Sequence, residues 1–437
     1  MTARLRKLID DIQDAFWLVP GLLVVLGAGG ALGMLMLDRM STASTASQSI
    51  WSYGGGATGA RALLGAIASS TITVAGTVFS ITVAALTLAA GQMGPRLLRN
   101  FTRDRGNQLV LGAYLGTFVY ALLVLRSVRS EEEGDFVPHL AVTAGIGLAV
   151  LCVFALVWFV DHMASRINVD TVISLVSEDL QNTICHLASD EAQPGPPLRD
   201  VWRGAEPVLD TRQGYLQQID AEAIADWAAE KGTAVRLLVR PGDFVFPNAP
   251  IALTVHPVDG AAAAIAGASA LNHQRSSSAD LEQSVRQLVE LALRALSPGI
   301  NDPFTAISVI DHLGAALCVL VPLHLPTGVV ERGGKVVTVV PGIDYDGLVD
   351  AMLHAIRQNA AGNPPVLIRM LEMLAAVGSA ERQPGRRRTL QRHAALVLAD
   401  AERSIEAPAD LADVRRRYDL LLAVTDGPDA DVGALVG

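Results

Sequence analysis

Four long apolar segments lie within the first 160 residues and constrain the fold more than any other feature of the chain. They are Phe16–Leu37, Ala62–Ala90, Leu109–Leu125 and Phe136–Val160. A helix needs about 20 apolar residues to cross the roughly 30 Å hydrocarbon core of a bilayer. Each segment is close to that length or longer, so the sequence predicts a domain of four transmembrane helices over residues 1–165.

The overall composition agrees with a membrane protein. Of the 437 residues, 51% are hydrophobic and only 18% are charged, whereas about a quarter of the residues of a soluble domain are charged. The formal net charge of −10 argues against a nucleic-acid-binding protein. The three cysteines, Cys152, Cys185 and Cys318, lie far apart without metal-ligand spacing, which favours a reducing compartment and predicts no metal site.

The composition changes to that of a soluble protein after Pro194–Pro197. We expect a helical connector over residues 166–198, a small β-rich unit over 199–260 and a mainly helical domain over 261–437, which together form a cytoplasmic α+β region. The segment around Arg240–Val245 resembles a barrel-sandwich module of the lipoyl or biotinyl kind, but no lysine occupies its hairpin tip. The sequence therefore predicts no carried cofactor.

Basic residues near the apolar segments predict the orientation in the membrane. Arg4, Arg6 and Lys7 precede the first segment, and a basic elbow follows the second segment. The elbow arginines are Arg96, Arg99, Arg103 and Arg105. Because positive flanks stay inside, we expect a multi-pass protein of the bacterial inner membrane with both termini in the cytoplasm. The elbow is expected to contact lipid headgroups, or to act in gating if it also contacts the cytoplasmic region.

The second apolar segment carries a stripe of small and hydroxyl side chains at a spacing of three or four residues. The stripe consists of Ser69, Thr73, Thr77, Ser80, Ala84, Thr87 and Gly91. Such residues lie on one face of a helix. One interpretation is close packing against another helix, which small residues favour. The other is the lining of a pore in an oligomer, where hydroxyls replace part of the hydration of an ion.

The heptapeptide Ser297–Pro303, SPGINDP, is the most distinctive motif outside the apolar segments. It is typical of a corner between two helices, with Gly299 in the left-handed region, Asp302 as N-cap and Pro303 at the first helical position. The alternative is a functional polar cluster at the new helix N-terminus. Its members would be Asn301, Asp302, Asp311 and His312.

Helices are expected to fill the rest of the chain, interrupted by a basic loop from Arg382 to Arg392. No nucleophile elbow, paired metal-binding histidines, Walker motif or dinucleotide fingerprint occurs in the sequence. The sequence therefore predicts a protein that is not an enzyme, without catalytic residues.

Three stretches resemble one protein family. They are Gly91–Leu125 (GQMGPRLLRNFTRDRGNQLVLGAYLGTFVYALLVL), Arg240–Val245 (RPGDFV) and Arg294–Leu313 (RALSPGINDPFTAISVIDHL). They look like an uncharacterised bacterial family of predicted membrane proteins, domain of unknown function 2254. The resemblance covers nearly the whole chain and implies an integral inner-membrane protein with a C-terminal cytoplasmic region. It implies no catalytic or binding residues.

Two functions are compatible with these features. The first is an oligomeric ion channel or pore, lined by the second transmembrane helix and regulated by the cytoplasmic region. Four spans without an inverted repeat leave little room for a pathway in one subunit, so a homo-oligomer is expected. The second is a non-conducting membrane sensor or scaffold, whose cytoplasmic region binds a partner or a small ligand.

Overall fold

The structure of the protein is a computed structural model, and it forms two compact units. The described residues are 16–41, 53–93, 104–129, 136–166, 168–195, 199–273 and 281–426. The first unit is Met1–Thr171 and the second is Val172–Gly437. The domain boundaries expected at residues 165, 198 and 260 stay a prediction.

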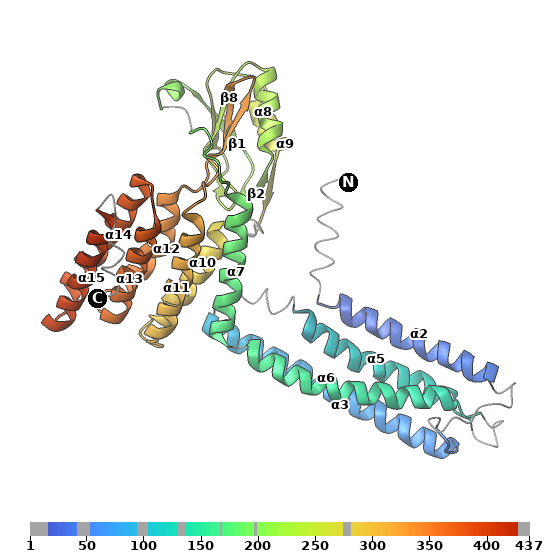
Figure 1. Cartoon of the computed structure of the whole chain (residues 1–437). Coiled ribbons are helices and arrows are strands. Elements are labelled where there is room, and N and C mark those ends of the chain that lie inside the picture. The colour runs from blue at the N-terminus through green and yellow to red at the C-terminus, as the bar shows by residue number, and fades with distance from the viewer. Residues whose placement is uncertain are drawn as a thin grey trace. The chain divides into compact units, whose positions relative to one another are not determined.

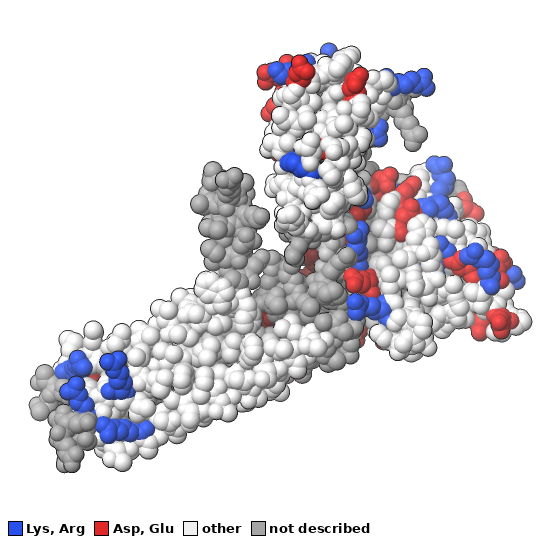
Figure 2. Space-filling model, turned by 180° about the vertical axis from the view of Figure 1, so that it is seen from behind, with Lys and Arg blue, Asp and Glu red and all other residues white. Residues whose placement is uncertain are grey.

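The described part of the first unit contains four long helices that lie lengthwise beside one another (Figure 1). They are α2 (Leu18–Ser41), α3 (Ala57–Met93), α5 (Arg105–Ser127) and α6 (His139–Arg166). All four are long and apolar enough to cross a membrane. In Figure 2 the visible surface of these helices is uncharged along most of its length, with arginines gathered at one end. This pattern suits helices surrounded by lipid.

Glycines bring α2 and α5 into direct backbone contact. A Cβ atom added at Gly27 would lie 2.4 Å from the carbonyl oxygen of Gly116. A Cβ atom added at Gly116 would lie 2.7 Å from the carbonyl oxygen of Leu23, and one at Gly112 would lie 2.6 Å from the Leu23 side chain. No other residue type fits such an approach, which is the usual way that membrane helices associate closely.

Buried polar groups fix α6 against α2 and α5. The carboxylate of Asp38 accepts hydrogen bonds from the backbone amides of Leu140 and Ala141, both at 2.9 Å, and so caps the first turn of α6 from α2. The hydroxyl of Tyr120 donates to the carbonyl of Ala141 at 2.8 Å. A polar group buried in an apolar layer is stable only when it is hydrogen-bonded, so these contacts define the helix register.

Most of α7 (Val169–Leu187) belongs to the second unit, and a short 3-10 helix, Arg199–Trp202, follows it. Its strands are β1 (Glu206–Asp210), β2 (Gly214–Ile219), β3 (Val235–Leu237), β4 (Phe244–Val245), β5 (Ala249–Thr254), β6 (Ser269–Asn272), β7 (Val329–Arg332) and β8 (Lys335–Val339). One sheet has the order β1-β5-β3-β8-β7 and the other the order β4-β2-β6. Only the β3–β8 pair is parallel among the described strands. The expected barrel-sandwich fold is not confirmed by this topology.

Helices α8 (Ala221–Glu230) and α9 (Ala261–Gly267) pack against these strands. The α8 helix begins directly after Asp220, which caps it by accepting from the amide of Ala223. A turn at Gly333-Gly334 joins β7 to β8, and both glycines have positive φ angles. This hairpin lies in the region expected to be mainly helical, and it completes the five-stranded sheet.

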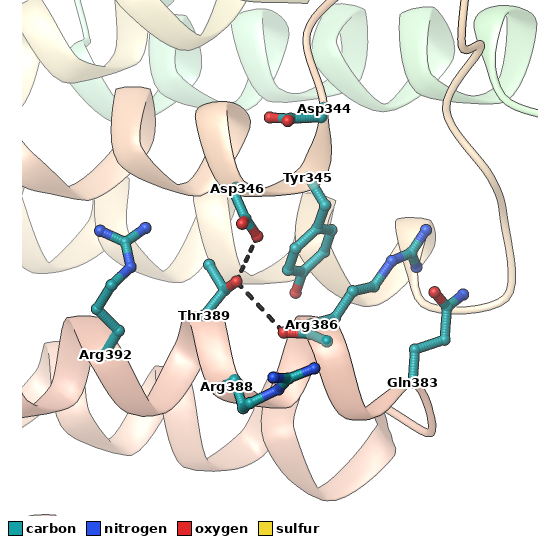
Figure 3. Close-up of a pocket in the computed structure, with 9 residues that line it drawn as sticks. Asp344, Tyr345, Asp346, Gln383, Arg386, Arg388, Thr389 and Arg392 are labelled. Atoms are coloured by element: carbon teal, nitrogen blue, oxygen red, sulfur yellow. Dashed lines mark hydrogen bonds between the residues drawn. The ribbon is translucent and has the colours of Figure 1, made fainter. Parts of the chain in front are cut away.

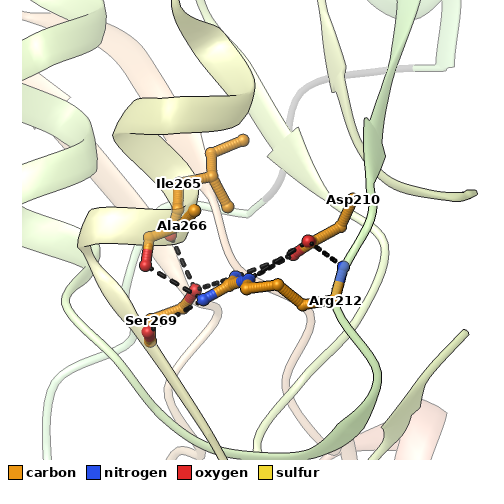
Figure 4. A network of polar contacts seen from close by, with 5 residues as sticks. All are labelled: Asp210, Arg212, Ile265, Ala266 and Ser269. Atoms are coloured by element: carbon orange, nitrogen blue, oxygen red, sulfur yellow. Dashed lines mark hydrogen bonds and ion pairs between the residues drawn. The ribbon is translucent and has the colours of Figure 1, made fainter. Parts of the chain in front are cut away.

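A polar network fastens the end of β1 to the turn after α9 (Figure 4). Arg212 donates to both carboxylate oxygens of Asp210, to the carbonyl of Ala266 and to the hydroxyl of Ser269. Burial alone would raise the pKa of Asp210, but the hydrogen bonds and charge of Arg212 leave that pKa below its usual value. The network is satisfied internally and therefore has a structural role.

The remaining helices of the second unit are α10 (Leu281–Ala295), α11 (Pro303–Leu320), α12 (Tyr345–Asn359), α13 (Pro364–Ala380), α14 (Pro384–Ser404) and α15 (Pro408–Thr425). Four of them have proline in the first turn, where its missing amide needs no acceptor. The expected basic loop from Arg382 to Arg392 is wrong, because α14 begins at Pro384 and contains most of it.

The count of four transmembrane helices is also not confirmed. Five described helices satisfy the length and hydropathy of a span, and α11 is the fifth. Within the second unit α11 packs against α10 and α13, and its side chains Ile310, Leu313 and Leu317 are fully buried there. The length and composition of α11 therefore match a span, although its neighbours already cover much of its surface.

Candidate functional site

The hydroxyl stripe lies on the face of α3 that points away from the rest of the first unit. Ser69, Thr73, Thr77, Ser80 and Thr87 are all exposed. The buried face of α3 is the opposite one, with Leu64, Ala68, Thr71, Ala75, Val78, Thr82 and Ala85. Packing against the other described helices of the first unit therefore does not use the stripe. Packing between subunits and pore lining both stay predictions.

Each stripe hydroxyl donates to the helix backbone. Thr73 donates to the carbonyl of Ser69 at 2.8 Å, Ser80 to that of Gly76 at 2.9 Å and Thr87 to that of Val83 at 2.9 Å. Such bonds let hydroxyl residues sit in an apolar layer without an unpaired donor. Because the hydroxyl proton is used in this bond, each stripe hydroxyl presents its oxygen lone pairs to its surroundings.

The outward faces of α2 and α6 have a different character. Large aliphatic or aromatic side chains are exposed there, as lipid contact requires. They include Leu22, Val25, Leu26 and Met36 on α2, and Val150, Leu151, Val153, Phe154 and Val157 on α6. The α3 helix also exposes Ile72, Phe79, Ile81 and Val83 beside the stripe. Among the described helices of this unit, the stripe is the exposed face richest in hydroxyls.

The basic elbow falls mostly outside the described residues. Arg96, Arg99 and Arg103 belong to the undescribed segment 94–103, and Arg105 is the exposed first residue of α5. Next to it Asp104 caps α5 by accepting from the amide of Gly106, and its other carboxylate oxygen lies 2.6 Å from Nε2 of His162 on α6. The sequence did not single out this contact, which joins the ends of two helices.

The SPGINDP segment forms the predicted corner. Asp302 accepts from the amides of Phe304 and Thr305 and from the Thr305 hydroxyl, and Pro303 begins α11. The Thr305 hydroxyl is the main reason that the pKa of Asp302 lies below its usual value. The predicted left-handed residue is wrong, however. Asn301 has a φ angle of 50°, whereas Gly299 is not in that region.

The four polar residues of this motif do not form a cluster. Asp311 pairs with Arg369 of α13 at 2.5 Å, and Asp302 is occupied by the cap of α11. Within residues 281–426, no hydrogen bond or ion pair joins two of Asn301, Asp302, Asp311 and His312. The capping contacts of Asp302 account for the corner, and a functional role of the four residues stays a prediction.

The structure instead reveals a pocket where α12 and α14 both begin (Figure 3). The pocket is open and has a volume of about 560 Å³, within the usual size of small-molecule sites. Its lining residues are Asp344, Tyr345, Asp346, Gln383, Gly385, Arg386, Arg388, Thr389 and Arg392. Three arginines against two aspartates leave one net positive charge on the lining.

The charged groups of the pocket differ in how they are engaged. Arg386 is buried and donates to the carbonyls of Leu320 and Leu323, while its charge lies 3.5 Å from Glu381. Asp346 accepts from the hydroxyl of Thr389. Among the described residues Arg388 has no ion-pair partner, and it is exposed. Its Nε donates to the carbonyl of Pro384 at 3.3 Å, and the rest of its guanidinium is available to a ligand.

Tyr345 contributes an unusual group to the same pocket. Only 7% of its surface is exposed, and its hydroxyl is buried without a hydrogen-bond partner. Figure 3 shows this hydroxyl directed from α12 toward the first turn of α14. Burial raises the pKa of Tyr345, so the phenol stays protonated and acts as a donor. A buried donor without an acceptor is rare and calls for an explanation.

One turn further along both helices, Asp350, His354 and His393 come close enough to hold a metal ion. Asp350 Oδ1 lies 3.1 Å from Nε2 of His354 and 2.8 Å from Nε2 of His393. The guanidinium of Arg392 lies 2.6 Å from the same oxygen. Since this cation already neutralises the one carboxylate of the cluster, the arrangement serves better to join α12 to α14 than to bind a metal.

Residues 13–376 match the family described as predicted membrane protein, DUF2254. The chain belongs to this family. The match covers the four helices of the first unit, the β-rich part and the helices up to α13. The expected family resemblance is thereby confirmed, including its implication that the protein is a membrane protein.

Relatives of the DUF2254 chain occur in mycobacteria. The uncharacterized protein MT1328 of Mycobacterium tuberculosis (strain CDC 1551 / Oshkosh) is 32% identical over 439 residues, which span 95% of this chain and 81% of the relative. The uncharacterized protein Mb1321c of Mycobacterium bovis (strain ATCC BAA-935 / AF2122/97) has the same identity and coverage. No solved structure matches the chain. These relatives assign no activity to the family, so the function has to be argued from the residues.

Proposed function

We propose that this membrane protein is a homo-oligomeric cation channel of the bacterial inner membrane, lined by the α3 helices of several subunits and regulated by the second unit. The observation that carries the proposal is the outward position of the hydroxyl stripe on α3. A face that packs against lipid needs no hydroxyls, and a face that packs inside the subunit would be buried. A shared axis between subunits accounts for both properties.

The hydroxyl geometry favours cations as the transported ions. Each stripe hydroxyl uses its proton in a bond to the preceding turn, as Thr77 does with the carbonyl of Thr73 at 3.2 Å. The oxygen lone pairs then face outward, and lone pairs replace the water around a cation rather than around an anion. Small side chains also let neighbouring α3 helices approach closely.

The orientation completes the proposal. Four spans, α2, α3, α5 and α6, would place both termini and the second unit in the cytoplasm, because that side has more basic residues in its flanks. The arginines at the opposite end are fewer, namely Arg39, Arg61, Arg126 and Arg129. The partners are then the lipid bilayer and further copies of the chain. In this arrangement α11 stays within the second unit, where its buried face already contacts α10 and α13.

Ion flux through the purified protein in liposomes tests the proposal, with the size of the detergent-solubilised oligomer measured alongside. The double substitution Thr77→Leu/Ser80→Leu should abolish cation flux while the oligomer persists. Gly147→Leu is the matched control, because Gly147 is exposed on α6 with nothing within 4 Å of an added Cβ atom. Undiminished flux from a verified oligomer of the double variant would remove the stripe from the pathway.

The alternative function is a non-conducting membrane sensor, and the pocket between α12 and α14 favours it. A sensor would show no flux at any pH or voltage, but its second unit would bind a ligand. Wild-type protein without flux, in liposomes where its oligomer is intact, would decide for this alternative.

A further inference from the structure

The pocket where α12 and α14 begin has the properties of an anion site. The first amides of a helix have no acceptor within the helix, and the helix dipole makes that end positive. At α12 this role is filled internally, because Asp344 accepts from the amide of Gly347 at 2.7 Å. At α14 the N-cap residue Gln383 makes no side-chain cap, and Gly385 and Arg386 line the pocket. The α14 end is thus open to an external acceptor.

Two side chains near this helix end, those of Arg388 and Tyr345, also favour an anion. Arg388 is exposed on the second turn of α14 and has no ion pair within the described residues. The hydroxyl of Tyr345, 93% of whose surface is buried, has no partner in the protein. Both groups donate hydrogen bonds, and both lie in the pocket wall. An acceptor-rich group in the pocket would accept from the amides and the guanidinium, and also from the phenol once the side chains that cover its oxygen move aside.

The two aspartates of the lining are already engaged, which narrows the ligand class. Asp344 is occupied by the cap of α12, and Asp346 accepts from the hydroxyl of Thr389. They do not offer a free carboxylate pair to a cation. We propose that the N-terminus of α14, Arg388 and Tyr345 bind the phosphate group of a ligand in this pocket. The proposal concerns the second unit alone and is independent of ion conduction.

Binding to the purified full-length protein in detergent tests this site, with pyrophosphate as the probe and isothermal titration calorimetry as the measurement. Arg388→Gln should weaken pyrophosphate binding about tenfold or more, as expected for a lost charge-assisted hydrogen bond. Arg415→Gln on α15 is the matched control, since Arg415 is exposed and paired with Glu402 outside the pocket. The control should bind like the wild type.

Tyr345→Phe gives a second and sharper test, because it removes only the unpaired hydroxyl. Without ligand this variant should be at least as stable as the wild type, since no hydrogen bond is lost. With pyrophosphate it should bind about fivefold more weakly, as expected for one neutral hydrogen bond. If Tyr345 had only a structural role, Tyr345→Phe would not lower the affinity for pyrophosphate while leaving the stability unchanged.

A phosphate group can belong to a soluble compound or to a lipid headgroup, and a second assay separates these sources. The full-length protein is placed in nanodiscs of neutral lipid, free of detergent, and mixed with phosphatidylcholine vesicles that do or do not contain phosphatidic acid. Capture of the nanodiscs by the vesicles is measured by flotation. Pyrophosphate binding that weakens in Arg388→Gln, without capture by phosphatidic acid, identifies a soluble ligand. Capture by phosphatidic acid alone, also lost in Arg388→Gln, identifies a headgroup. The proposal is overturned if neither pyrophosphate at millimolar concentration nor phosphatidic acid binds. It is also overturned if binding is unchanged in both Arg388→Gln and Tyr345→Phe.

Discussion

Acidification from pH 7 to pH 4 should destabilise the pairing of α12 with α14, because His393 is buried between them. Its side chain is fully buried, and Nε2 lies 2.8 Å from Oδ1 of Asp350. Its Nδ1 atom is buried without a partner. Burial, together with the charges of Arg392 and His354, lowers the pKa of His393 from 6.5 to about 4, although Asp350 opposes the shift.

The sign and size of the effect follow from this lowered pKa. In the unfolded chain His393 takes up its proton near pH 6.5, whereas in the folded protein it does so only near pH 4. Stability is therefore complete above about pH 6.5, falls as the pH drops through this window and levels off below it. A shift of roughly 2.5 pKa units corresponds to about 3 kcal/mol of unfolding free energy.

Amide hydrogen exchange of the full-length protein, followed by mass spectrometry on peptides from α12 and α14, measures this local stability. After correction for the intrinsic exchange rate, the opening free energy should fall by about 3 kcal/mol between pH 7 and pH 4. His393→Leu should abolish most of the pH dependence. His256→Leu is the matched control, because His256 is exposed.

Two outcomes would refute the reasoning about His393. One is protection of α14 that stays constant from pH 7 to pH 4 in the wild type. The other is an equal loss of protection in the His393→Leu variant, which would assign the acid sensitivity to other groups.

Two further predictions concern stability. Gly116→Leu should separate α2 from α5 and destabilise the first unit by at least about 1–3 kcal/mol, because the α2 backbone lies 2.7 Å from the added Cβ atom. Unfolding in mixed micelles measures this loss of stability, and a loss no larger than that of Gly147→Leu would contradict the prediction. Asp400→Asn should destabilise the second unit by about 3–5 kcal/mol in chemical denaturation, since it leaves the buried guanidinium of Arg357 without its carboxylate. The control Asp413→Asn, at a half-exposed carboxylate, should change stability by less than about 1 kcal/mol.

Much of the local structure could be predicted from the sequence. The four apolar segments became α2, α3, α5 and α6, and Asp220 and Asp302 cap the helices that follow them. These features depend on hydropathy and on the chemistry of a few adjacent residues, which act within one or two turns. The many arginines after Gln383 favour a loop on composition, and the predicted loop is wrong because Pro384 is a helix start signal and α14 begins there.

The phosphate-site proposal depends on residues that the sequence separates widely. Tyr345 and Arg388 lie in different helices, and neither stands in a recognisable motif. Packing of α12 beside α14 brings their first turns together, and this contact cannot be read from either segment. A proline followed by several arginines at a helix start was the one signal that could have pointed to the site.

The sequence by itself determined that α3 carries a hydroxyl stripe, because a spacing of three or four residues places side chains on one helix face whatever surrounds the helix. Only the tertiary structure decided that this face points away from α5 and α6. The physical reason is that α3 has two faces of small residues, and the bulk and fit of the neighbouring helices select the one that is buried.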